Sequence, residues 1–203
     1  LPQILLEPHL ALELNNDKLN QLLSQARSTR LLASLAHQLQ HAAVDSQLST
    51  TVSRHLRSAL LIHDKQKRDL AYDSEKIKLV LNSISERLVL LKGAAYMLAE
   101  LPVGRGRLIT DIDILVPQQR IDEVERSFNK FGWNSGYVNN YNGRYYRKWS
   151  HEIPPLTNRK RGTTLDVHHN VLPPTAGPNV NASLFFDRLI EVKPGIFTLY
   201  WQD

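Results

Sequence analysis

Residues 110–116, which read TDIDILV, alternate acidic and aliphatic side chains with the period of a β-strand. In such a strand Asp111 and Asp113 share one face, and the aliphatic residues share the other. Residues i and i+2 lie roughly 7 Å apart along a strand, by the ~3.3 Å rise per residue, so both carboxylates can converge on one cation. A strand with one solvated face is the alternative interpretation of this pattern.

A second stretch, TLDVH at residues 164–168, alternates in the same way and places Asp166 and His168 on one face. If the two strands are neighbours, Asp111, Asp113 and Asp166 form an oxygen cluster of the kind that binds Mg²⁺ together with phosphate. Two such ions can bind the attacking oxygen and the leaving oxygen of a displacement reaction at phosphorus. His168 could contact base, ribose or metal, or could be a satisfied structural residue.

Upstream of the acidic strand, residues 87–91 (RLVLL) predict a buried strand that turns at Lys92 and Gly93 into a helix beginning at Ala94. The start of such a helix presents unpaired N–H groups to an anion, and the small side chains let a phosphate approach. Lys92 and Arg107 can neutralise triphosphate charge. Simple chain reversal at the glycine and ordinary solvated basic residues are the alternatives.

Local signals predict the remaining elements. Apolar residues at three- and four-residue spacings predict about three helices before residue 86, one of them beginning behind the potential caps Asp73 and Ser74. Pro117 is expected to open a helix that Gly132 ends. Further strands are expected over residues 133–141, 145–153 and 163–169, and a helix over 183–191.

We therefore expect an α/β fold in two parts, an N-terminal helical region (1–74) and a domain with a small mixed sheet flanked by helices (75–203). The chain stops abruptly at Asp203, which leaves open whether further residues complete this domain.

Composition narrows the function classes. The 203 residues include no Cys, which excludes disulfides, thiolate metal sites and a cysteine nucleophile. The 25 Lys and Arg against 20 Asp and Glu give a formal net charge of +5, which favours anionic ligands. No apolar run reaches the ~20 residues of a membrane span, and the N-terminus lacks the pattern of a signal peptide. We expect a cytoplasmic protein without a membrane partner.

Two other features offer competing interpretations. His37 and His41 at i, i+4, or His151 with His168, could hold a metal ion such as zinc, although surface and structural histidines are commoner. Residues 141–149 interleave aromatic and basic side chains and are followed by Arg-Lys-Arg at 159–161, which would suit single-stranded nucleic acid. Cross-strand pairing in a hairpin accounts for the same aromatics.

Taken in order, LKGAA at 91–95, Arg107 with TDIDILV at 110–116, and LDVH at 165–168 resemble the polymerase-beta-like nucleotidyltransferase superfamily. Within it, they are most similar to a family of uncharacterised prokaryotic nucleotidyltransferases. The resemblance covers roughly residues 75–192. It implies transfer of a nucleoside monophosphate from a nucleoside triphosphate to an acceptor, with release of pyrophosphate.

The resemblance also implies residue roles. Asp111 and Asp113 would ligate two Mg²⁺ ions, Asp166 would hold the catalytic ion and help deprotonate the acceptor hydroxyl, and Gly93 would lie beneath the triphosphate. The superfamily's Gly-Gly or Gly-Ser turn is Gly93-Ala94 here, so a hydroxyl that often contacts phosphate is missing.

Two further function classes stay open. The first is a non-catalytic nucleotide-sensing or protein-interaction module, and the second is a basic nucleic-acid-binding module. Nothing in the sequence indicates the nucleobase, the acceptor or the oligomeric state.

Overall fold

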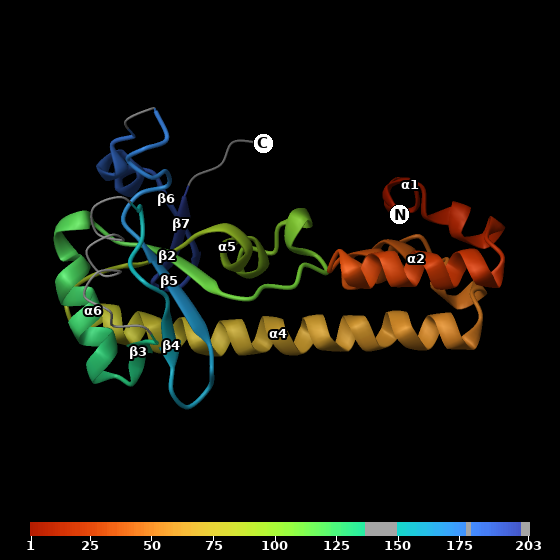
Figure 1. The fold of residues 1–203 in the computed structure, drawn as a ribbon, viewed down its shortest axis with the longest axis horizontal. Coiled ribbons are helices and arrows are strands. Elements are labelled where there is room, and N and C mark those ends of the chain that lie inside the picture. Colours follow the sequence, from red (N-terminus) through yellow and green to blue (C-terminus); the bar gives the residue numbers. More distant parts are fainter. Residues whose placement is uncertain (137–149, 178–179, 200–203) are drawn as a thin grey trace. The chain divides into compact units, whose positions relative to one another are not determined.

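The computed structural model describes residues 1–136, 150–177 and 180–199. The chain forms two compact units. The first comprises Leu1–Asp69 with Glu100–Ile109, and the second comprises Leu70–Ala99 with Thr110–Asp203. The boundary at residue 69 falls inside one long helix, α4, which is coloured orange to yellow in Figure 1.

The first unit is helical. Its elements are α1 (Pro2–Leu6), α2 (Asn16–Ser28), α3 (Leu32–His41) and the first part of α4 (Thr50–Asn82), with 3-10 turns at Pro8–Glu13, Asp45–Gln47 and Pro102–Gly104. The side chain of Asn15 caps α2 by accepting a hydrogen bond from the backbone N–H of Lys18 at 3.0 Å. The predicted Leu and Ala stripes of α2 and α3 form one buried cluster with residues of α1 and α4.

The segment Glu100–Ile109 completes the first unit through polar contacts with α4. The Gln66 side chain pairs with both backbone groups of Ile109, at 2.6 Å to its carbonyl and 2.9 Å from its N–H. The Lys67 ammonium lies 2.7 Å from the Glu100 carboxylate. These contacts join residues of α4 and of the segment that are 33 and 43 positions apart in the sequence.

The structure corrects the expected helix start at Asp73 and Ser74, because α4 passes through both residues without a break. Both side chains are buried. Asp73 accepts hydrogen bonds from Arg161 Nε at 2.6 Å and from Thr163 Oγ1 at 2.8 Å. The carboxylate therefore anchors the loop that carries Arg161 and Thr163. The residue types that cap helices also form tertiary hydrogen bonds, so Asp73 and Ser74 do not by themselves mark a helix start.

The second unit contains a mixed seven-stranded sheet in the order β3-β4-β5-β2-β1-β7-β6. The strands are β1 (Leu88–Leu90), β2 (Ile112–Leu115), β3 (Trp133–Ser135), β4 (Leu156–Asn158), β5 (Thr164–His168), β6 (Leu189–Lys193) and β7 (Ile196–Leu199). Helices α5 (Lys92–Leu98) and α6 (Ile121–Lys130) lie beside it, contacting β2 and β3 respectively (Figure 1). The predicted fold class is confirmed.

Pairing within the sheet is parallel at β1–β7 and β2–β5 and antiparallel elsewhere. All four residues of β2 are buried, so this strand is covered on both faces. A central position of this kind explains why its aliphatic residues belong to the core.

The expected helix over residues 183–191 is wrong. A 3-10 segment, Ala182–Asp187, is followed by β6 and β7, which pair through a turn at Pro194 and Gly195. Gly195 has φ +71°, a conformation that glycine adopts without strain. Phe185, Phe186, Leu189 and the β7 residues Phe197 and Leu199 pack against a buried cluster from β1 and β2.

Other boundaries shift by a few residues. α5 begins at Lys92 rather than Ala94, and Pro117 precedes a 3-10 turn (Gln118–Arg120) before α6. Gly132, with φ +84°, follows the end of α6 as predicted. Of the expected strand over 133–141, only Trp133–Ser135 is observed as β3, and residues 137–149 lie outside the described part. In that part no helix combines the length and hydropathy needed to cross a membrane.

Candidate active site

The two acidic strands, β2 and β5, are parallel neighbours, as a shared cation site requires. Their register sets Asp113 opposite Asp166 and Leu115 opposite His168. Asp111 lies one residue before β2. Because paired residues of parallel strands point to the same face, the alternation read from the sequence places Asp113 and Asp166 on one face of the sheet.

Asp113 occupies the centre of this group and is only 4% exposed. Its Oδ1 lies 2.6 Å from Lys92 Nζ and 2.9 Å from His168 Nε2. Burial alone would raise the pKa of this carboxyl, but the hydrogen bonds from His168 and Lys92 outweigh burial and hold the pKa below its ordinary value. A solvated strand face therefore does not account for Asp113.

Lys92 joins the site from the junction of β1 and α5. Its backbone has φ +48°, a left-handed conformation that costs a non-glycine residue roughly 1–2 kcal/mol. Burial opposes the charged form, yet the hydrogen bond and charge of Asp113 raise the pKa of Lys92. The side chain is 56% exposed, so the ammonium touches a buried carboxylate while remaining accessible. Gly93 and Ala94 follow it as buried residues of the first turn of α5.

Asp166 is the carboxylate that lacks compensation. Its Oδ1 is buried and has no hydrogen-bond partner. Burial, followed by the neighbouring negative charges of Asp111 and Asp113, raises the pKa of Asp166 to about 6. An orphaned buried oxygen among like charges fits a bound divalent cation, and an all-oxygen donor set is the one that Mg²⁺ prefers.

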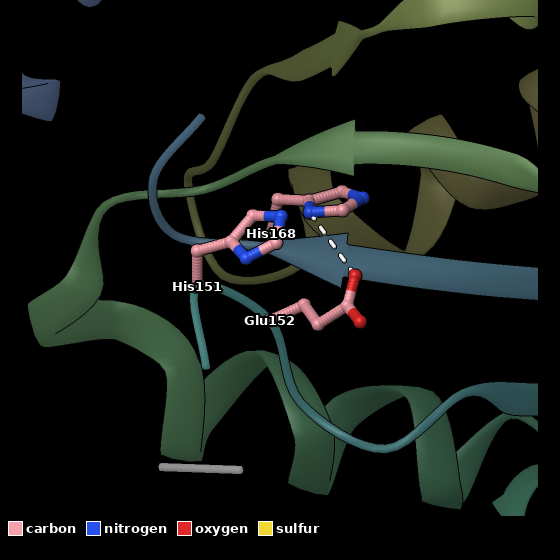
Figure 2. A group of neighbouring side chains, drawn as sticks. All are labelled: His151, Glu152 and His168. Atoms are coloured by element: carbon pink, nitrogen blue, oxygen red, sulfur yellow. Dashed lines mark ion pairs between the residues drawn. The ribbon is translucent and has the colours of Figure 1, made fainter. Parts of the chain in front are cut away.

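His168 also faces a second group, drawn in Figure 2. His168 Nδ1 lies 3.3 Å from Glu152 Oε2, and the His151 and His168 rings are 5.1 Å apart. Burial, then the neighbouring imidazole of His168, lowers the pKa of His151. The sequence pattern paired His151 with His168 but gave no sign of Glu152. The bridge that sets Glu152 opposite His168 depends on strand register, which local patterns do not specify.

Other predicted residues lie elsewhere. Arg107 belongs to the Glu100–Ile109 segment of the first unit, and its contact with a nucleotide stays a prediction. The aromatic and basic residues 141–149 lie outside the described residues. Within the described part, Arg161 pairs with Asp73 and stacks over the Tyr72 ring at 4.7 Å, while Arg159 donates to Asn134. These two cations support the fold of the second unit.

A hollow of about 710 Å³ lies at the carboxyl ends of β2 and β5. Its lining includes Pro117, His169 and Asn170, together with residues 180–183 and Phe186. The three aspartates do not contribute to this lining, so the hollow and the acidic group are separate features of the sheet.

Asp113 and Asp166 lie on adjacent strands of a small mixed sheet, and Asp111 immediately precedes the first of these strands. A protein-family model described as "Uncharacterised nucleotidyltransferase" matches residues 15–199. The chain therefore belongs to this family of nucleotidyltransferases. The match also takes in most of the helical first unit, which lies outside the stretch covered by the motifs. No curated protein and no solved structure matches the chain.

Proposed function

We propose that this protein is a magnesium-dependent enzyme that transfers a nucleoside monophosphate from a nucleoside triphosphate to a hydroxyl acceptor and releases pyrophosphate. The observation that carries the proposal is the register of β2 and β5, which sets Asp113 opposite Asp166 and leaves Asp166 Oδ1 buried without a partner. Membership of a nucleotidyltransferase family supports the same reaction class.

Asp111, Asp113 and Asp166 would hold the Mg²⁺ ions. Bound there, Mg²⁺ supplies Lewis-acid stabilisation of the charge that develops on phosphoryl oxygens. Lys92 neutralises Asp113 in the structure described. Since its side chain is largely exposed, Lys92 can turn to a triphosphate once the acidic group is otherwise compensated. The buried first turn of α5, with Gly93 and Ala94, is the surface that we assign to the phosphates.

Asp166 is the residue that we assign to the acceptor. Asp166 would hold the Mg²⁺ ion beside the acceptor hydroxyl and accept the proton that this hydroxyl loses during transfer. His168 holds Asp113 through Nε2 and so acts as a positioning residue for the acidic group.

A non-catalytic nucleotide-binding module is a second candidate, favoured by one observation. Lys92 and His168 both contact Asp113 Oδ1, so protein groups already compensate this carboxylate. Such a module would bind a triphosphate and release no pyrophosphate. The basic nucleic-acid module predicts instead steeply salt-dependent oligonucleotide binding that Asp→Asn changes leave intact.

The proposal is tested by calorimetric titration of ATP, GTP, CTP and UTP with Mg²⁺ or EDTA, followed by pyrophosphate release in the presence of candidate hydroxyl acceptors. We expect Asp111→Asn and Asp166→Asn to lower turnover roughly a thousandfold, because losing a metal ligand removes several kcal/mol of transition-state stabilisation. Asp187→Asn, an exposed acid of the same unit, is the matched control and should leave turnover unchanged.

A cooperative thermal unfolding transition is the check that each variant is folded. Full turnover in folded Asp111→Asn and Asp166→Asn would contradict the proposal. Metal-dependent binding of a triphosphate without pyrophosphate release would favour the non-catalytic module.

A further inference from the structure

We propose that His151, Glu152 and His168 form a second cation site in this protein, one that takes Zn²⁺ rather than Mg²⁺. Each residue offers one ligand atom, and the three atoms lie within 4.8 Å of one another. Among the described residues, this is the one group of three histidine or acidic side chains drawn so closely together (Figure 2). The site goes beyond the proposed function, which uses the aspartates.

The backbone holds the ligands in place. Glu152 bridges His168 in an antiparallel pair, and Ile153 N–H donates to the Val167 carbonyl at 3.0 Å. The His151 carbonyl accepts from His169 N–H at 2.8 Å. The segment that carries His151 and Glu152 is therefore fixed along the edge of β5, where His168 lies, and little backbone order must be gained when a metal binds.

The hydrogen bonding of His168 prepares it as a ligand. His168 Nε2 forms a hydrogen bond with Asp113 Oδ1 at 2.9 Å. Its other ring nitrogen, Nδ1, faces Glu152 Oε2 at 3.3 Å. A ligating histidine whose other nitrogen donates to a carboxylate is the arrangement found around protein-bound zinc.

His151 supplies the third donor. Its Nδ1 is buried and has no hydrogen-bond partner in the described structure. A buried, unpartnered imidazole nitrogen beside a second imidazole is costly unless something occupies it. The ring of His151 contributes one nitrogen to the group of three ligand atoms.

The donor set decides which ion is preferred. Two imidazole nitrogens and one carboxylate oxygen suit zinc, whereas Mg²⁺ prefers oxygen ligands throughout. Zinc bonds of ~2.1 Å in a tetrahedron separate the ligand atoms by about 3.4 Å. Ligand atoms spread over as much as 4.8 Å can reach that spacing by rotation of the side chains. Three protein ligands leave a fourth position for water or for an oxygen of a substrate.

The test is a Zn²⁺ titration of the full chain in competition with a chromogenic chelator, with Co²⁺ absorption as a measure of coordination geometry. We expect one Zn²⁺ per chain, a tetrahedral Co²⁺ spectrum, and no competition from millimolar Mg²⁺. His151→Asn and Glu152→Gln should each weaken binding at least 10- to 100-fold, as should Asp113→Asn, which removes the carboxylate behind His168.

Two control variants distinguish this site from zinc binding at the other histidine pair and at the aspartates. His41→Asn changes an exposed histidine of the His37 and His41 pair and should leave Zn²⁺ affinity unchanged. Asp111→Asn should also leave it unchanged while abolishing Mg²⁺-dependent nucleotide binding, so failure of the zinc site and failure of the proposed function give different results. Absence of saturable Zn²⁺ binding by the folded wild-type protein, or wild-type affinity in His151→Asn, would overturn the inference.

Discussion

Asp166 gives the acidic site a pH dependence whose sign can be worked out. Its pKa rises from 3.8 in the unfolded chain to about 6 in the folded protein, so the folded state holds this proton more tightly. Without a divalent cation, the carboxyl therefore lowers stability progressively as pH rises from about 4 to about 6, and the penalty is constant above that range.

Asp166→Asn should remove this penalty. In EDTA at pH 7 we expect the variant to gain on the order of 1–2 kcal/mol in free energy of unfolding, a value discounted for solvent screening of a partly buried group. At pH 4 the gain should vanish. Urea denaturation at both pH values measures it, and Mg²⁺ should stabilise the wild type more than the variant. A loss of stability at pH 7 would show that the fold itself satisfies this carboxylate.

At the same site, the backbone strain of Lys92 is offset by its contact with the Asp113 carboxylate. Lys92 is held in a left-handed conformation that glycine would adopt freely, and the cost persists because the ammonium reaches a carboxylate that is 4% exposed. Residues with strained backbones cluster at functional sites, and the strained residue Lys92 lies next to the acidic group rather than in a surface turn.

At the scale of elements, Gly106 controls how the Glu100–Ile109 segment packs on α3. A Cβ at Gly106 would lie 2.4 Å from the Ser34 backbone nitrogen and 2.5 Å from the Ala33 carbonyl, and the residue has φ +69°. We expect Gly106→Ala to cost about 2–4 kcal/mol, because rigid backbone on both sides must move.

The matched control for this change is Gly162→Ala. Gly162 has nearly the same φ, +70°, but nothing lies within 4 Å of the added Cβ. In urea denaturation, Gly162→Ala should lower the free energy of unfolding by about 1 kcal/mol, which is the cost of the left-handed backbone conformation alone. Equal losses at both positions would contradict the close packing of Gly106.

The loop between β4 and β5 is anchored to α4 by Asp73. This carboxylate, buried in the helix, receives Arg161 and Thr163, and the Arg161 guanidinium also covers Tyr72. We expect Asp73→Ala to lower the free energy of unfolding by about 1–2 kcal/mol, because it removes the buried carboxylate that accepts hydrogen bonds from Arg161 and Thr163. Lys65→Ala, which breaks the exposed Lys65–Asp69 pair on the same helix, should cost at most about 0.5 kcal/mol. Similar values for both variants would argue against the anchor.

At the scale of the whole molecule, the spacing of apolar and acidic residues along the sequence predicted individual strands and helices. The two acidic strands and the faces shared by their aspartates follow from alternation alone, and α6 follows from its apolar stripe. That β2 and β5 are neighbours could only be posed as a condition, because the pairing joins residues about fifty positions apart.

The incorrect predictions have physical causes. Asp73 and Ser74 resemble caps, since residues that end helices are also those that hydrogen-bond across a core. The apolar run after residue 183 was too short to distinguish helix from strand, although the Pro194-Gly195 turn was a signal for a hairpin. Glu152 became part of the site only through its bridge to His168.

The assignment of Glu100–Ile109 to the first unit bears on the order in which the protein is made. A ribosome delivers residues 1–69 first, but the partners of Gln66 and Lys67 lie at residues 109 and 100. The helical unit therefore cannot be completed until β1 and α5 have also been synthesised. A nascent chain arrested near residue 75 should be readily cut by protease, and one arrested after residue 109 has cleared the exit tunnel should become resistant in its N-terminal part.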